Sequence, residues 1–209
     1  MSLTDAEMEF YTKRNEVLFG TAEKFCTEQG LPKDFIYKVY KSESDWEFIL
    51  KVDALLETAA KLILRNGLQI QLRLRTFEDK SSFVEVPTGV IQNEILEEFV
   101  DGLPMDGRTS LLRLLEASGL PNEDLGFIRA ARQVRNGFAH DIKSVNSKLI
   151  DIIKPRPDKS NLVKLLCAIQ EYDEAELIAQ YEDDPSFFRF GIFDWTLRFL
   201  LYAYHIGKS

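Results

Sequence analysis

The sequence is poor in the side chains on which metal sites and disulfide frameworks depend. Of its 209 residues, two are cysteine and two are histidine. Cys26 and Cys167 are far apart and belong to no CxxC pair, so we expect two buried thiols in a reduced compartment. With only His140 and His205 as imidazoles, a zinc site built from histidine and cysteine would lack ligands. We therefore expect no metal and no other cofactor.

A surplus of positive charge and a long uninterrupted apolar run are also missing. The chain has 26 Lys and Arg against 34 Asp and Glu, a net charge of -8. Duplex DNA and acidic membranes repel such a chain as a whole, so contact with nucleic acid needs a local basic patch. The most apolar stretch, 187–206, contains Arg189, Asp194 and Arg198, which are costly in hydrocarbon. The charged, amphipathic start of the chain does not match a secretory signal. We expect a cytoplasmic protein without a membrane span.

Apolar residues recur at helical spacing along most of the chain, and 45% of all residues are apolar. Gly30 and Gly119 are placed to end helices, and Ser42 or Ser44 to cap one. We expect helices over 4–30, 33–40, 45–64, 90–100, 109–118, 121–140, 144–153, 160–169, 174–181 and 186–206. The fold class is therefore all-α. One helical domain over 1–209 is the simplest fit, with a helical extension at 1–41 and a helical bundle at 43–206.

The stretch 68–86 is ambiguous. Leu68, Ile70, Leu72 and Leu74 alternate with polar residues, which is the period of a half-exposed strand. Residues 83–86 could supply a second strand, giving a small β-hairpin. The alternative is that the long helix continues past Gly67.

The segment 127–141, FIRAARQVRNGFAHD, contains the one polar constellation that suggests chemistry. On a helix, Arg129, Arg132, Asn136 and His140 share one side, and Arg135 borders it. The apolar residues of the opposite side are Ile128, Ala131, Val134 and Phe138. Asn136 lies one turn before His140 and can hold its imidazole in one tautomer. Guanidinium groups fit phosphate, and an imidazole transfers protons near neutral pH.

These residues resemble a known family. Arg135, Asn136 and His140 match the Arg-x4-6-His motif of the HEPN superfamily, including the polar residue after the arginine. The run 110–119 followed by 127–141 resembles the mannitol-operon-repressor-like branch, as does the long helix at 45–64. The resemblance covers about residues 43–145 and a compatible last helix. It implies an up-and-down helical bundle, and the stretches 1–41 and 68–86 depart from it.

The resemblance also implies roles for particular residues. Many HEPN proteins are metal-independent ribonucleases that act as homodimers. On that pattern His140 would act on the ribose 2′-hydroxyl or the leaving oxygen, Arg135 would neutralise the phosphate, and Asn136 would orient His140. Glu57 is the first candidate to pair with Arg135, and Asp53 is the second. The residues that would contact RNA beside them are Arg129 and Arg132.

Three functions remain open at this point. The mannitol-operon-repressor-like branch is associated with regulation, so we expect a regulator that acts through RNA or a protein partner, for example in transcription or stress response. The first alternative is the ribonuclease itself. The second is a protein-interaction module, because the last helix has more aromatic residues than one buried face needs. Arg135 and His140 would then only bridge neighbouring helices. The acidic run 171–184 is typical of a solvated helix face.

Overall fold

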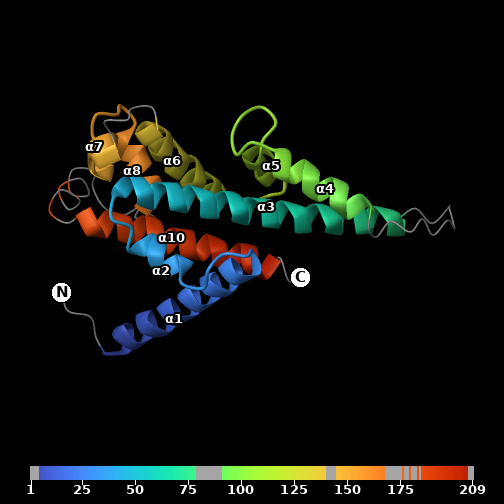
Figure 1. Ribbon diagram of the computed structural model, residues 1–209, viewed down its shortest axis with the longest axis horizontal. Coiled ribbons are helices and arrows are strands. Elements are labelled where there is room, and N and C mark those ends of the chain that lie inside the picture. The colour runs from blue at the N-terminus through green and yellow to red at the C-terminus, as the bar shows by residue number, and fades with distance from the viewer. Residues whose placement is uncertain are drawn as a thin grey trace.

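The protein was analysed as a computed structural model that describes residues 5–78, 91–139, 145–167, 176, 179, 183 and 185–206. Every element of regular secondary structure in the described part is a helix (Figure 1), which confirms the all-α fold class. The elements are α1 (Asp5–Glu28), α2 (Phe35–Tyr40), α3 (Asp45–Glu78), α4 (Ile91–Gly102), α5 (Leu111–Ala117), α6 (Asn122–Ala139), α7 (Leu149–Ile153), α8 (Lys159–Cys167) and α10 (Pro185–Ile206).

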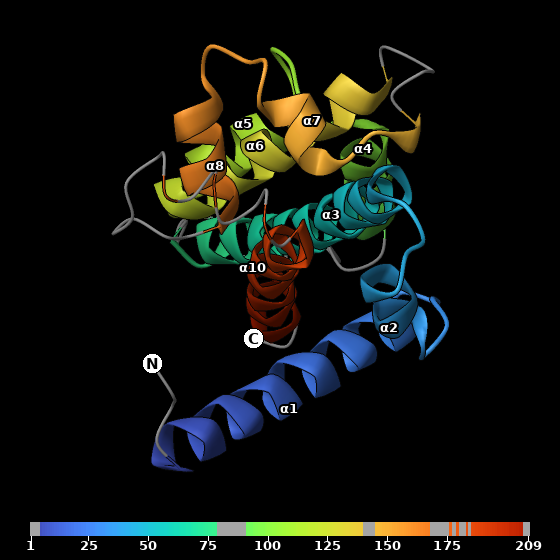
Figure 2. The same cartoon turned by 90° about the vertical axis from the view of Figure 1, so that its left-hand side faces the viewer.

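The helices are arranged in layers around α3. Figure 2 shows α5, α6, α7 and α8 on one side of α3, α10 on its other side, and α1 beyond α10. Leu18, Ala22 and Phe25 of α1 belong to the same buried hydrophobic cluster as the cores of α3, α6 and α10. The division into an extension at 1–41 and a bundle at 43–206 stays a prediction.

The aromatic residues of α10 are explained by its position. This helix packs against α3 on one side and α1 on another, and it also contacts α6, α7 and α8. Phe188, Phe193 and Phe199 are each 1% exposed, whereas Phe190 and Tyr202 remain 46% and 41% exposed. The prediction of a core helix is confirmed. Within the described ranges, no helix combines the length and apolarity needed to cross a bilayer.

Of the two alternatives for 68–86, the hairpin is wrong where it can be compared with the structure. Helix α3 runs through Gly67 to Glu78, so 68–78 is helical, whereas 79–86 lies outside the described residues. Leucine, glutamine and arginine are good helix formers, and one glycine costs only about 1 kcal/mol. Helix α4 packs against α3, and an ion pair between Arg65 and Asp101 joins the two helices. Local propensity and this partner helix favour the helical alternative.

The two helix ends predicted from glycines agree with the structure. Gly30 and Gly119 have φ angles of 74° and 86°, which glycine adopts without strain. Ser44, not Ser42, caps α3, because the Ser44 hydroxyl accepts a hydrogen bond from the Glu47 amide at 3.1 Å. The helix expected at 174–181 falls mostly outside the described residues.

Both cysteines are buried thiols, as predicted, and neither is part of a disulfide. Burial, with a smaller contribution from nearby Glu23, raises the pKa of the Cys26 thiol to about 11. Cys26 is therefore protonated at neutral pH.

Two glycines let neighbouring helices approach α6 closely. A Cβ atom at Gly126 would lie 2.7 Å from Leu165 Cδ2, and one at Gly137 would lie 2.6 Å from Ile152 Cγ2. Both distances are shorter than carbon atoms tolerate. Gly137 therefore fixes how closely α7 packs beside the end of α6.

We predict that Gly137→Ala destabilises the protein although alanine favours helix. Overpacking against the stiff, β-branched Ile152 costs about 1–3 kcal/mol, and the helix-propensity gain of about 1 kcal/mol offsets part of it, so we expect a net loss of up to about 2 kcal/mol. The melting temperature should fall by about 2–4 °C for each kcal/mol of net loss. In an Ile152→Ala background the same substitution should stabilise, because the clashing methyl group is gone. A higher melting temperature for Gly137→Ala in the unmodified protein would contradict this packing argument.

Candidate functional site

Helix α6 holds the predicted motif up to Ala139, and its orientation is as expected from the sequence. Acidic residues Glu123 and Asp124 occupy its first turn, where they interact favourably with the helix dipole. Its buried face consists of Leu125, Phe127, Ile128, Ala130, Ala131, Val134 and Phe138. This face packs against α3 and α8. The polar residues of the motif therefore lie along the edge of the contact with α3.

Two arginines of α6 share one carboxylate on α3. Arg132 Nη1 donates hydrogen bonds to Asp53 Oδ1 and Oδ2 at 3.2 and 3.1 Å. Arg135 Nε lies 3.5 Å from Asp53 Oδ2, close enough for an ion pair. The Asp53 side chain is 9% exposed, that of Arg132 19% and that of Arg135 35%. We call Asp53, Arg132, Arg135 and Asn136 the Asp53 cluster.

The Asp53 cluster keeps a surplus of positive charge. Burial raises the pKa of the Asp53 carboxyl group, and the attraction of Arg132 and Arg135 offsets only part of this effect. Two guanidinium groups face one carboxyl group, so the cluster retains at least one positive charge in either state of Asp53. In a chain with a net charge of -8, this is a local surplus of positive charge.

Arg135 is held at two of its guanidinium nitrogens. Its Nη1 donates a hydrogen bond to Asn136 Oδ1 at 3.1 Å, and Asp53 attracts its Nε. That Nε is buried without a hydrogen-bond partner. An arginine has five N–H donors, and within the described residues only one donor of Arg135 makes a hydrogen bond. Asn136 and Asp53 thus position the side chain, and its remaining N–H groups make no hydrogen bond to the described part of the chain.

The predicted pairing of Arg135 with Glu57 is wrong. Glu57 lies one turn after Asp53 on α3, and its Oε1 is 2.9 Å from Lys61 Nζ. Asp53, the second candidate, lies level with Arg132 and Arg135 and is more deeply buried than Glu57. The position of α6 along α3 therefore selects Asp53. Glu57 acts on the cluster only at longer range, where its charge raises the pKa of Asp53.

His140 lies outside the described residues, and so does the predicted hydrogen bond between Asn136 and His140. Asn136 does have a partner that was not expected from the sequence, because its Oδ1 accepts the hydrogen bond from Arg135. The amide oxygen therefore holds the arginine with one lone pair, and its second lone pair and the amide nitrogen are left to orient a neighbour.

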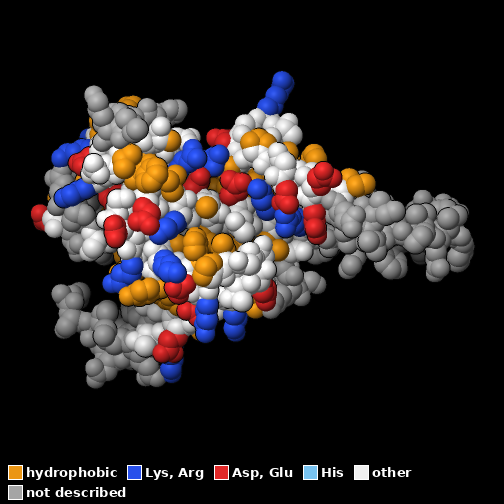
Figure 3. Space-filling view, viewed as in Figure 1, with side chains coloured by type: hydrophobic (Ala, Val, Ile, Leu, Met, Phe, Trp, Pro, Cys, Tyr) orange, Lys and Arg blue, Asp and Glu red, His pale blue; other side chains and the backbone are white. Residues whose placement is uncertain are grey.

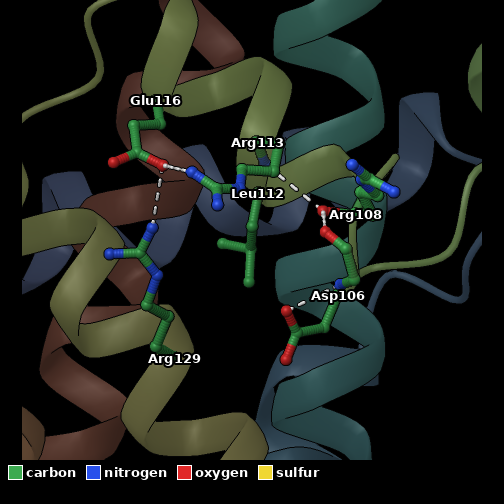
Figure 4. Close-up of a pocket in the computed structure, with 8 residues that line it drawn as sticks. Asp106, Arg108, Leu112, Arg113, Glu116 and Arg129 are labelled. Carbon is green, nitrogen blue, oxygen red and sulfur yellow. Dashed lines mark hydrogen bonds and ion pairs between the residues drawn. The ribbon is translucent and has the colours of Figure 1, made fainter.

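Arg129 lies near a different acid. Its Nη2 is 3.1 Å from Glu116 Oε2, and Arg113 Nη1 approaches the same oxygen at 3.4 Å. These residues line a surface hollow of about 420 Å³ between α5, α6 and the loop before α5. In Figure 4, Arg113 and Arg129 approach Glu116 from two sides, and Arg108 points away from it.

The sequence reasoning missed this hollow. The Arg113 and Glu116 pair has an i,i+3 spacing that the sequence does display. The loop at 103–110 gave no such signal, although it places Asp106 and Arg108 at the rim.

Within the described ranges, no group of three or more His, Cys, Asp or Glu side chains is arranged to hold a metal ion. Comparisons of the chain with protein-family models, with curated proteins and with solved structures found no match.

Proposed function

We propose that this protein is a helical regulator that binds RNA, and that Arg135 contacts a phosphate group of the RNA. The Asp53 cluster is the observation that supports this proposal. Its two arginines share one carboxylate, and Arg135 is positioned by Asp53 and Asn136 with a third of its side chain exposed. The planar guanidinium fork matches the oxygen atoms of a phosphate.

The charge distribution favours a single strand over duplex DNA. The net charge of -8 repels a long duplex, whose affinity depends on many phosphate contacts at once. A single-stranded segment can approach a small basic site with few contacts and with its bases free to turn away. The resemblance of Arg135, Asn136 and His140 to the HEPN motif points to RNA as the nucleic acid.

RNA cleavage without a metal is the second candidate function. It is favoured by the fixed position of Arg135, since a preorganised guanidinium group stabilises charge that develops on a phosphate. Arg135 and His140 are five residues apart in sequence, so on a continuous helix the imidazole would follow the arginine by about 1.4 turns.

We predict that Arg135→Gln weakens RNA binding about tenfold, which corresponds to about 1.4 kcal/mol. The variant should remain folded, because Arg132 still pairs with Asp53. Fluorescence anisotropy with a labelled 12-nucleotide RNA over a series of salt concentrations would measure the change. The slope of log affinity against log salt should fall by about 0.7 for the lost contact with a single strand.

The matched control is Arg198→Gln. Arg198 is a half-exposed arginine of α10 that pairs with Asp194. Its substitution removes the same charge from another part of the protein. An equal loss of affinity in both variants, or no binding by the unmodified protein, would refute the proposed function.

A further inference from the structure

The hollow around Glu116 repeats the arrangement of the Asp53 cluster. One carboxylate again lies between two arginines, with Glu116 Oε2 at 3.4 Å from Arg113 and 3.1 Å from Arg129. Here both arginines are more exposed, with 67% and 44% of their side chains accessible. Each acid therefore orients two guanidinium groups without neutralising both.

Arg108 adds a third guanidinium group at the rim of the hollow. It is exposed, and in the described part of the chain it forms no ion pair. The charged residues that line the hollow are three arginines and two acids, Asp106 and Glu116. The lining thus has a surplus of one positive charge, and its arginines can reach an anion from more than one side.

Helix α6 contributes residues both to the hollow and to the proposed RNA site. Arg129 is one turn before Arg132 and six residues before Arg135, which is about 9 Å along the helix axis and about 120° around it. At 3.4 Å per stacked nucleotide, about three nucleotides span this distance. Figure 3 shows Lys and Arg side chains grouped over α6, with acidic side chains between them. One strand can therefore contact both arginine pairs.

We infer that the hollow lined by Arg108, Arg113 and Arg129 is a second phosphate-binding site for the RNA strand that binds at Arg135. This inference rests on the proposed function. Arg113 and Arg129 bind one phosphate while Glu116 holds them in place, and Arg108 contacts the strand where it leaves the hollow. The strand then crosses the edge of α6 towards the Asp53 cluster.

The double variant Arg113→Gln/Arg129→Gln tests the inference. Glu116 is 43% exposed, so water can solvate it after both partners are removed, and the fold should be retained. With the 12-nucleotide RNA we expect at least a tenfold loss of affinity and a decrease of about 1.4 in the salt slope, for two lost contacts with a single strand. With a two-nucleotide RNA, too short to reach both sites, Arg135→Gln and this double variant should each lose only part of the binding.

A control with the same change in charge is Lys24→Gln/Arg198→Gln, on exposed positions of α1 and α10. Circular dichroism would verify the fold of every variant. If the Arg113→Gln/Arg129→Gln protein binds the 12-nucleotide RNA as tightly as the unmodified protein while Arg135→Gln does not, the second site is refuted and the proposed function stands. If the unmodified protein binds no RNA, or if the control loses as much affinity, both are refuted.

Discussion

Asp45→Ala is expected to lower the free energy of unfolding by about 3 kcal/mol, because it removes two charge-assisted hydrogen bonds of about 1.5–3 kcal/mol each. Asp45 is the first residue of α3, and its Oδ2 accepts a hydrogen bond from the Leu149 amide at 2.6 Å. Its Oδ1 accepts a second one from Arg189 of α10. The side chains of Asp45 and Arg189 are 11% and 21% exposed, so water replaces these bonds poorly. One carboxylate thus joins α3, α7 and α10.

Two further substitutions separate the parts of this effect. Asp45→Asn keeps an acceptor for the Leu149 amide but loses the charge that attracts Arg189, so its loss should be intermediate. Asp34→Ala removes an acid whose ion pair with Lys38 is solvent-exposed, and the urea midpoint should not change. Equilibrium unfolding in urea would rank the three variants. Equal midpoints for Asp45→Ala and Asp34→Ala would show that the Asp45 contacts do not stabilise the fold.

Asp45→Ala should also weaken RNA binding at the proposed site. Leu149 begins α7, and Ile152 of α7 packs against the backbone of α6 at Gly137. Asp45 therefore fixes the element that follows the Arg135 and His140 motif in sequence. Once α7 is released, the end of α6 loses the neighbour that holds it.

The helices and the buried side of α6 could be predicted because they depend on local sequence. Ile128, Ala131, Val134 and Phe138 are each at most 1% exposed, as their helical spacing indicated. The helix ends marked by glycine or serine were also predicted correctly, since capping involves only neighbouring residues. The alternation at 68–74 wrongly indicated a strand. A period of two in a short segment does not override good helix formers packed beside another helix.

The partners of the site residues could not be predicted, since they depend on how helices cross. Asp53 and Glu57 differ by one turn of α3, and only the position of α6 along α3 decides which of them meets Arg135. Glu116 and Arg129 lie on different helices that a glycine-containing turn brings together. Sequence spacing identified the arginines of α6 as a group. The structure divides them between two acids.

If the protein cleaves RNA, His140→Ala is the substitution that should lower the cleavage rate most. A positioned imidazole that transfers protons contributes about 10²–10⁴-fold to the rate, so the variant should lose cleavage by that factor while still binding RNA. The activity should persist in EDTA, because on this proposal the imidazole and Arg135 do the work of a metal. Time courses with labelled RNA, resolved on denaturing gels, would measure it.

The sequence contains its own control for this experiment. His205 is the only other histidine, and it lies at the end of α10 beside Tyr204. His205→Ala should cleave RNA like the unmodified protein, whereas Arg135→Gln should lose both binding and rate, since it removes the charge that stabilises the phosphate. Cleavage that disappears in EDTA, or that is the same in His140→Ala and His205→Ala, would exclude catalysis by this motif. RNA that is bound at Arg135 but never cut would leave a binding protein in which the motif recognises phosphate without reacting with it.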